Sequence, residues 1–119
     1  MNFSNNLDTA VNRDKTIFEL QAEVCKSIAS AKRLEIINAL KTGEKSVTEL
    51  VEILGVPKAN VSQHLATMRN KGILKARRNG VNIYYSISSQ KVIEACSLMR
   101  EVLTEMMRDR KKMLKLIEI

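Results

Sequence analysis

The stretch 73-ILKARRNGVNIYYSI-87 alternates apolar and polar residues on either side of Asn79-Gly80. An Asn-Gly pair favours a two-residue type I′ turn, because both central residues of that turn need positive φ. Folding the chain about this pair brings Arg78 opposite Val81. We therefore expect a β-hairpin with basic residues at its tip.

The alternation also separates the hairpin into two faces, because successive side chains of a strand point to opposite sides. The apolar face consists of Leu74, Ala76, Val81, Ile83, Tyr85 and Ile87. The polar face consists of Lys75, Arg77, Asn82, Tyr84 and Ser86. A slip by one residue would exchange the faces, so the pattern fixes which side packs on the rest of the protein.

Two helices are expected directly before the hairpin. The motif 46-SVTE-49 is a capping box, in which the first and last side chains bond to each other's backbone N–H groups. It predicts a short helix that ends at Gly55, followed by a second helix from about Pro57 to Lys71, closed by Gly72. Two helices joined by a tight turn and followed by a basic hairpin indicate a winged helix-turn-helix.

Further helices are expected upstream. Apolar residues recur at helical spacing from Thr16 to Ala29, and Ser30 is suited to cap a second helix that stops at Gly43. The residues of this second helix expected to face inward are Leu34, Ile37 and Leu40. Residues 1–15 have no pattern, so we expect a flexible segment or a weak extra helix there, followed by one domain over 16–119.

The chain ends in a helix expected from about Ser89 toward Lys115. Its seam residues recur at 4-3-4-3 spacing with one arginine among them: Val92, Cys96, Met99, Leu103, Met106, Arg110, Met113 and Ile117. Such a seam favours a homodimer formed by the first and last helices. Packing of the seam on its own domain, or a mixture of the two arrangements, remains an alternative.

Composition and charge limit the partners. The chain has 119 residues, no long apolar run and no basic, apolar start, so we expect a cytoplasmic protein without a membrane partner. Residues 1–57 carry a net charge of −1 and residues 58–119 a net charge of +8. The segment from Lys58 to Arg78 holds six basic residues and no acidic one, which favours a polyanion partner such as DNA.

The helix expected over 57–71 has the properties of a DNA-reading helix. Taking Val61 as the inward direction places Leu65 and Met68 on the same buried side. The outward residues are Ala59, Gln63, Ala66, Thr67 and Asn70, flanked by Asn60 and Ser62. A small, uncharged polar face of this kind can enter a major groove and hydrogen-bond to base edges.

His64, the only histidine, lies at the boundary of that surface. A metal site needs several converging ligands, and the sequence offers neither a second histidine nor a nucleophile at credible spacing. We therefore expect no metal, no cofactor and no catalytic residues. Two roles remain open for His64, a hydrogen bond to a DNA phosphate or a packed boundary position.

The residues 30-SAKRLEIINALKTGEKSVTELVEILGVPKANVSQHLATMRNKGILKARRNGVNIYYSI-87 resemble the ArsR-type (ArsR/SmtB) winged helix-turn-helix repressors. The most specific pieces are Arg33-Leu34, 61-VSQHL-65, 72-GIL-74 and Tyr84-Tyr85. The resemblance implies a homodimer with one recognition helix in each half-site, released from DNA by an inducer. Many members have serine and glutamine where this chain has Pro57 and Lys58, so the chain departs from the family pattern at the start of the recognition helix.

The residues expected to contact DNA come from the resemblance together with the outward face. They are Lys58, Ala59, Asn60, Ser62, Gln63, His64 and Thr67, with Arg77 and Arg78 on the hairpin. The resemblance does not identify an inducer site, because the residues that sense inducers in other members are absent from this chain. Metal-sensing members carry a Cys-x-Cys pair where this chain has residues 49–53 without a thiol, and redox-sensing members carry cysteines where this chain has Asn38 and Thr104.

Cys25 and Cys96 are the remaining candidates for a sensor. Both lie on helices expected in the dimer layer, as two packed apolar residues or as a thiol switch for oxidants, persulfides or thiophilic ions. The function expected from the whole sequence is a homodimeric, operator-specific repressor with an unidentified inducer and no enzyme activity. The alternatives are a thiol-based repressor using these two cysteines, a non-specific architectural DNA-binding protein and an adaptor for RNA or acidic proteins.

Overall fold

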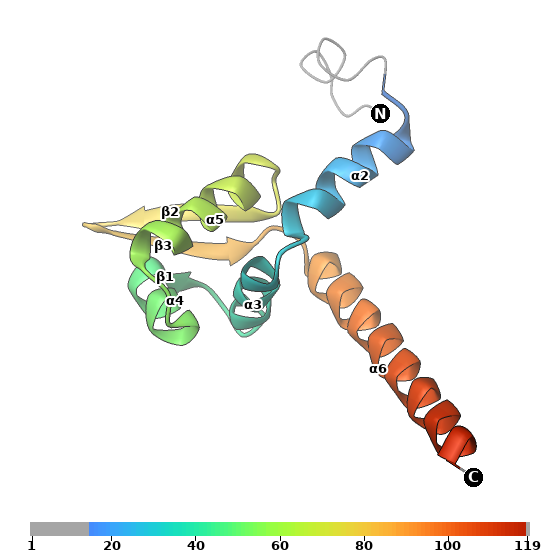
Figure 1. The fold of residues 1–119 in the computed structure, drawn as a ribbon. Helices are drawn as coiled ribbons and strands as arrows, with labels where there is room; N and C mark the ends of the chain where they lie inside the picture. Colours follow the sequence, from blue (N-terminus) through green and yellow to red (C-terminus); the bar gives the residue numbers. More distant parts are fainter. Residues whose placement is uncertain (1–14, 119) are drawn as a thin grey trace.

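The structure is a computed structural model that describes residues 15–118 (Figure 1). The expectation of a flexible segment or extra helix over 1–15 thus lies outside the described residues, apart from the exposed Lys15. The elements are α2 (Ile17–Ile28), α3 (Ala31–Leu40), β1 (Lys45–Ser46), α4 (Val47–Leu54), α5 (Lys58–Asn70), β2 (Leu74–Asn79), β3 (Asn82–Ile87) and α6 (Gln90–Glu118). This order confirms the predicted winged helix-turn-helix.

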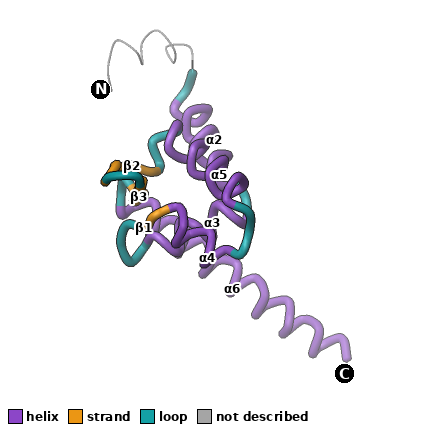
Figure 2. The backbone as a smooth tube through the Cα atoms, turned by 90° about the vertical axis from the view of Figure 1, so that its left-hand side faces the viewer, coloured by secondary structure: helices purple, strands orange, loops and turns teal. Residues whose placement is uncertain are grey.

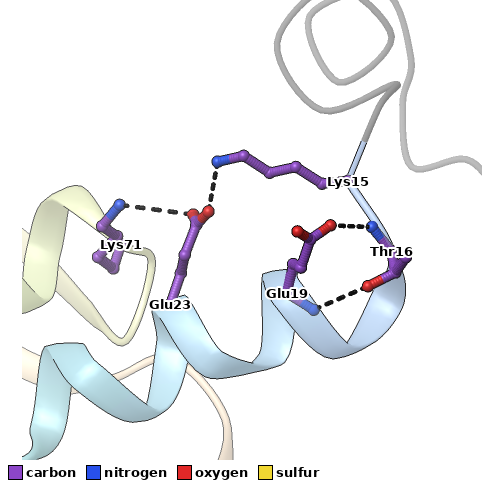
Figure 3. Close-up of polar contacts among 5 residues, drawn as sticks. All are labelled: Lys15, Thr16, Glu19, Glu23 and Lys71. Carbon is purple, nitrogen blue, oxygen red and sulfur yellow. Dashed lines mark hydrogen bonds and ion pairs between the residues drawn. The ribbon is translucent and has the colours of Figure 1, made fainter.

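The helix boundaries follow from side-chain caps. Thr16 and Glu19 form a capping box at the start of α2, which Figure 3 shows, and the Ser30 hydroxyl accepts a hydrogen bond from the Arg33 N–H at the start of α3. The predicted box of Ser46 and Glu49 opens α4, with bonds of 2.8 and 3.1 Å. These caps satisfy N–H groups that have no partner inside the helix.

Replacing Ser46 with alanine removes one acceptor of this box and is expected to lower the free energy of unfolding by about 1 kcal/mol. Thr48→Ala is the matched control, because Thr48 is exposed and belongs to α4 without being its cap residue. Chemical denaturation of both variants gives the comparison. Equal losses in the two variants would contradict a specific capping effect.

The core lies between α3, α4, α5 and the hairpin. Its buried side chains are Ile36, Ile37, Leu40, Leu50, Leu54, Val61, Leu65, Met68, Ile73, Leu74 and Tyr85. Only one of these residues is aromatic, so packing depends on aliphatic and methionine side chains. The helix-turn-helix and the wing therefore share one core, which fixes the recognition helix relative to the hairpin.

The expected inward face of α3 was wrong at one position. Leu34 is 40% exposed, whereas Ile36 is fully buried beside Ile37 and Leu40. At about 100° per residue, Ile36, Ile37 and Leu40 occupy a narrower arc of the helix than Leu34, Ile37 and Leu40. The narrower apolar arc faces the core, and Leu34 lies outside it.

The hairpin belongs to a three-stranded antiparallel sheet with strand order β1-β3-β2. The sequence did not predict β1, which has two residues and pairs Lys45 with Tyr85 and Ser46 with Tyr84. A strand this short carries no alternation to detect. It connects the start of α4 to the wing.

The predicted turn is wrong by one residue. Asn79 pairs with Asn82 at the end of the ladder, so Gly80 and Val81 form the turn and Arg78 lies opposite Ile83 rather than Val81. Gly80 has φ +67° and supplies the left-handed residue, while Val81 is 94% exposed at the tip. Moving the turn by one residue shifts the partner of each strand residue by two positions. Because side chains alternate with a period of two, every strand residue keeps its predicted face, and only Val81 leaves its face by becoming part of the turn.

The helices α2 and α6 extend away from this body in different directions, as both views show (Figures 1 and 2). The first turns of α6 contact α3 and β3, and Val92 and Cys96 are half-buried there. The rest of the predicted seam is exposed: Met99, Leu103, Met106, Met113 and Ile117. Within one chain, therefore, only the start of the seam is packed.

None of the described helices is both long and apolar enough to cross a membrane.

Candidate nucleic-acid interface

The recognition helix α5 is held to the core by one face. Val61, Leu65 and Met68 have no exposed surface, which confirms the predicted anchors. The helix ends at Asn70 and is followed by Gly72, at φ +80°, and the Ile73 N–H donates to the Met68 carbonyl at 2.9 Å. The chain then passes directly into β2, so the anchors also fix where the wing begins.

The opposite face of α5 is open to solvent. The exposed predicted contact residues on this helix are Lys58, Ala59, Asn60, Ser62 and Gln63. Thr67 is half-buried, and its hydroxyl donates to the Gln63 carbonyl at 3.1 Å. Its hydroxyl proton is therefore used within the helix, whereas its oxygen can still accept a hydrogen bond.

His64 is half-buried and has a partner that the sequence did not predict. The Arg33 Nε–H donates to His64 Nδ1 at 3.1 Å, and Arg33 Nη1 donates to the Ser27 carbonyl at 3.3 Å. Burial lowers the pKa of His64 below its usual 6.5, and the positive charge of Arg33 lowers it further. The imidazole is therefore packed and neutral at physiological pH.

A second contact ties α2 to the end of the recognition helix (Figure 3). The Glu23 carboxylate lies 3.9 Å from Lys71 Nζ and also accepts a hydrogen bond from Lys15. These neighbours lower the pKa of Glu23, and the hydrogen bond from Lys15 is the largest cause. The pair with Lys71 and the bonds of Arg33 thus join α2 to the residue after α5 and to His64 in its middle.

On the wing, Arg77 is already paired. Its Nε and Nη2 groups donate to both oxygens of Glu44, at 2.6 to 3.1 Å, and its guanidinium lies 4.9 Å from the ring centre of Tyr84. The hydrogen bond lowers the pKa of Glu44 and raises that of Arg77. A fork-to-fork pair of this kind orients the guanidinium.

Arg78 differs from its neighbour. Its side chain is exposed, it lies opposite Ile83 near the tip, and it makes no ion pair with the residues that the structure describes. The exposed Lys75 lies further down the same strand. Within the described residues, Arg78 and Lys75 are therefore the wing cations that no carboxylate neutralises, and Arg78 is the one nearer the tip.

The two cysteines do not form an evident reactive site. Cys25 is exposed on α2, and Cys96 is half-buried on α6. Burial raises the pKa of Cys96, which the charge of Arg100 only partly offsets, so its reactive thiolate form is disfavoured. Within residues 15–118, no three histidine, cysteine or acidic side chains converge in a way that could hold a metal ion.

Sequence reasoning missed Arg33 and Glu44 as parts of this surface. Each acts on a predicted contact residue 31 or 33 positions away. Arg33 belongs to the Arg33-Leu34 motif on which the family resemblance partly rests, but that motif does not indicate that its partner is His64. Glu44 lies in a short polar loop that carries no comparable signal.

Comparisons with known proteins agree with this geometry. Residues 30–76 match the model of the family described as bacterial regulatory protein, arsR family. The chain is 47% identical over 75 residues to the transcriptional repressor PagR of Bacillus anthracis, covering 62% of this chain and 75% of PagR. It is 34% identical over 95 residues to the regulator Rv0081 of Mycobacterium tuberculosis, covering 79% of this chain and 83% of Rv0081.

Solved structures give the same result. The crystal structure of Rv0081 superposes with a TM-score of 0.72 at 33% identity, over 81% of this chain and 97% of that one. A homodimeric winged helix-turn-helix DNA-binding domain from Mycobacterium bovis, Mb0332, superposes with a TM-score of 0.68 at 27% identity, over 88% and 92%. PagR is named a transcriptional repressor and Rv0081 a transcriptional regulator. The chain belongs to the arsR family of bacterial regulatory proteins.

Proposed function

We propose that this protein is a homodimeric, cytoplasmic repressor of transcription that binds a specific DNA operator and is released by an inducer. The observation that carries the proposal is the division of α5 into a fully buried face and an exposed, uncharged polar face. The relative PagR, which shares 47% identity over the matched region, is itself named a transcriptional repressor. Double-stranded DNA is thus the partner that the surface fits best.

In the proposed complex, α5 enters the major groove. Asn60 and Gln63 carry amides that can pair with adenine N6 and N7, and the Ser62 hydroxyl can donate or accept. Lys58, at the start of α5, would contact a phosphate. Ala59 adds little bulk, so the helix can approach the bases closely.

The wing supplies sequence-independent affinity. Arg78 is exposed near the hairpin tip, where a guanidinium can reach the phosphates or a narrow minor groove. Arg77 takes part only if a phosphate replaces the Glu44 carboxylate. The two arginines are therefore expected to contribute unequally.

The Arg78→Ala variant is expected to bind all DNA sequences more weakly and to lower the salt slope of binding by about 0.9 for each of the two wings of the dimer, one phosphate contact per wing. Arg108→Ala is the matched control, because it removes the same charge from an exposed position far along α6. Fluorescence anisotropy at several salt concentrations measures both slopes. An Arg78→Ala slope equal to that of wild type would contradict the wing contact.

Glu44→Gln is expected to act in the opposite direction. It removes the carboxylate that holds Arg77, so that guanidinium becomes available to a phosphate and affinity for any duplex rises. The same salt series measures the effect, with Glu52→Gln on the exposed side of α4 as the control for a lost negative charge. If only the total charge mattered, both variants would gain equally.

The dimer is proposed from the exposed apolar surface of α2 and α6. Besides the seam of α6, α2 exposes Ile17, Phe18 and Val24 in the single chain. Apolar surface of this extent marks an interaction site in a protein of this size. A second copy of the chain is the proposed partner, because Mb0332, which shares the fold, is homodimeric.

The inducer site is left open in this proposal. A switch formed by Cys25 and Cys96 gains no support, because burial raises the pKa of Cys96. Operator binding titrated with oxidant, persulfide and arsenite, in wild type and in Cys25→Ser and Cys96→Ser, tests the switch directly. The switch would be established if a reagent releases the operator from wild type but from neither serine variant. It would be excluded if no reagent releases the operator from wild type.

Base readout by α5 tests the proposed function itself. Selection of bound duplexes from a random pool is expected to return one sequence with two related half-sites for wild type. Gln63→Ala is expected to change the preferred base at one position per half-site, whereas Arg78→Ala keeps the wild-type preference. Selection that returns no shared sequence would favour an architectural DNA-binding protein instead.

A further inference from the structure

Arg33 connects three parts of the molecule. From the first turn of α3, it donates to the Ser27 carbonyl in the last turn of α2 and to the His64 ring on the recognition helix. The Ser27 side chain is itself buried, and its hydroxyl donates to the Val24 carbonyl at 2.6 Å. The guanidinium is therefore fixed by a carbonyl of α2 while it bonds to α5.

This bond determines the state of the His64 ring. A neutral imidazole has one N–H donor and one acceptor nitrogen, and Nδ1 is the acceptor here because Arg33 Nε–H points to it. The proton must then be on Nε2. In the part of the chain that the structure describes, Nε2 has no hydrogen-bond partner, so its N–H remains available to a molecule outside the chain.

We propose that Arg33 is a positioning residue that holds His64 with its proton on Nε2, and that this N–H donates to a DNA phosphate. The proposal rests on the proposed function, because it needs DNA against the exposed side of α5. Through its bonds to the Ser27 carbonyl and to His64, Arg33 also connects α2, a helix of the proposed dimer layer, to the DNA-binding surface. Arg33 itself does not touch DNA.

Protonation of His64 would break this arrangement. An imidazolium carries N–H groups on both nitrogens, so its Nδ1–H would face the Arg33 N–H and its charge would face the guanidinium. Arg33 is the one charged group that acts on His64 among the described residues. The desolvated ring and the neighbouring cation together keep the neutral form, which lowers the pKa of His64.

The single histidine makes the ring state measurable in the intact protein. Long-range proton–nitrogen NMR spectra of the free wild-type protein are expected to show Nδ1 as the unprotonated nitrogen and Nε2 as the protonated one. The pKa is expected below 6.5, and in Arg33→Met it is expected to move back toward that value. A ring with its proton on Nδ1 in wild type would overturn the proposal without any variant.

DNA binding supplies the second readout. At about pH 7.5, Arg33→Met and His64→Ala are each expected to weaken operator binding by about ten- to a hundredfold, the effect of one hydrogen bond lost in each protomer of the dimer. The double variant is expected to bind no worse than the weaker single variant, because both changes remove one contact. Arg108→Met, which removes the same charge far along α6, is expected to bind as wild type does.

The pH profile separates positioning from a general loss of folding. As the pH falls from about 8, wild-type operator affinity is expected to change at a lower pH than that of Arg33→Met, because burial and the charge of Arg33 both lower the pKa of His64. In Arg33→Met only burial lowers the pKa of His64, so the ring gains its proton at a higher pH than in wild type, and its new charge strengthens binding to phosphate. An unchanged profile in a folded Arg33→Met protein, or additive losses in the double variant, would refute the proposal.

Failure of the proposed function gives a different pattern. If wild type binds no specific duplex, the repressor assignment fails, whatever the ring state of His64. If wild type binds its operator and His64→Ala binds equally well, only the positioning role of Arg33 fails.

Discussion

Replacing Leu65 with alanine is expected to lower the free energy of unfolding by about 2–5 kcal/mol. Leu65 has no exposed surface and lies on the buried face of the recognition helix, so alanine leaves a cavity in the core that it shares with Val61 and Met68. The whole stability of a domain is only about 5–15 kcal/mol, so the loss is a large part of it. Chemical denaturation followed by circular dichroism measures the change.

Leu34→Ala is the matched control for that measurement. The chemical change is identical, but Leu34 is 40% exposed on α3 and buries less of its side chain. Its loss is expected to be less than half that of Leu65→Ala, because a partly exposed side chain leaves no closed cavity. Equal losses would contradict the packing of α3 and would restore Leu34 as a core residue.

Replacing Leu103 with glutamate is expected to convert the dimer to monomers and to weaken operator binding by about a hundredfold or more. Leu103 is 53% exposed in the single chain, so the substitution does not disturb the core. In the proposed dimer it would place a carboxylate in an apolar seam, where burial of an unpaired charge is costly. Sedimentation measures the mass, and anisotropy measures the affinity for DNA.

Thr104→Glu is the control, because it adds the same charge one position along α6 and away from the seam. It is expected to remain dimeric and to keep most of its affinity for the operator. A dimeric Leu103→Glu protein would show that α6 does not form the dimer contact through this seam. Monomers in both variants would mean that charge on α6, rather than its apolar seam, controls assembly.

Much of the fold could be predicted from local signals. The capping box at Ser46 and the glycines after α4 and α5 gave the limits of both helices of the helix-turn-helix correctly. Alternation along residues 73–87 gave the two faces of the wing. Each of these signals depends on residues within a few positions of one another, where backbone geometry alone determines the outcome.

The errors come mostly from tertiary packing, which signals between neighbouring residues do not encode. A type I′ turn centred on Asn79-Gly80 was expected because Asn tolerates positive φ, but Asn79 stays in the ladder opposite Asn82 and Gly80, with its positive φ, is the first residue of the turn. On α3, Leu34 and Ile36 are both apolar, and only the position of the core distinguishes them. Strand β1 exists because the wing offers a partner for it.

For the candidate site, the sequence predicted the surface but not its internal bonds. The anchors of α5 and its exposed polar face follow from helical periodicity. The bonds from Arg33 to His64 and from Arg77 to Glu44 join residues more than thirty positions apart, and no periodic pattern predicts them. These long-range bonds, however, decide which atoms of His64 and which arginine of the wing remain free for DNA.

Competition between a selected operator and random duplex DNA tests the central claim most directly. At a fixed salt concentration, the dimer is expected to prefer its operator by about a thousandfold or more, the ratio typical of sequence-specific binding. Gln63→Ala should reduce this ratio, while Arg78→Ala should weaken both affinities and leave the ratio nearly unchanged. Equal affinity of the wild-type protein for operator and random DNA would contradict the account.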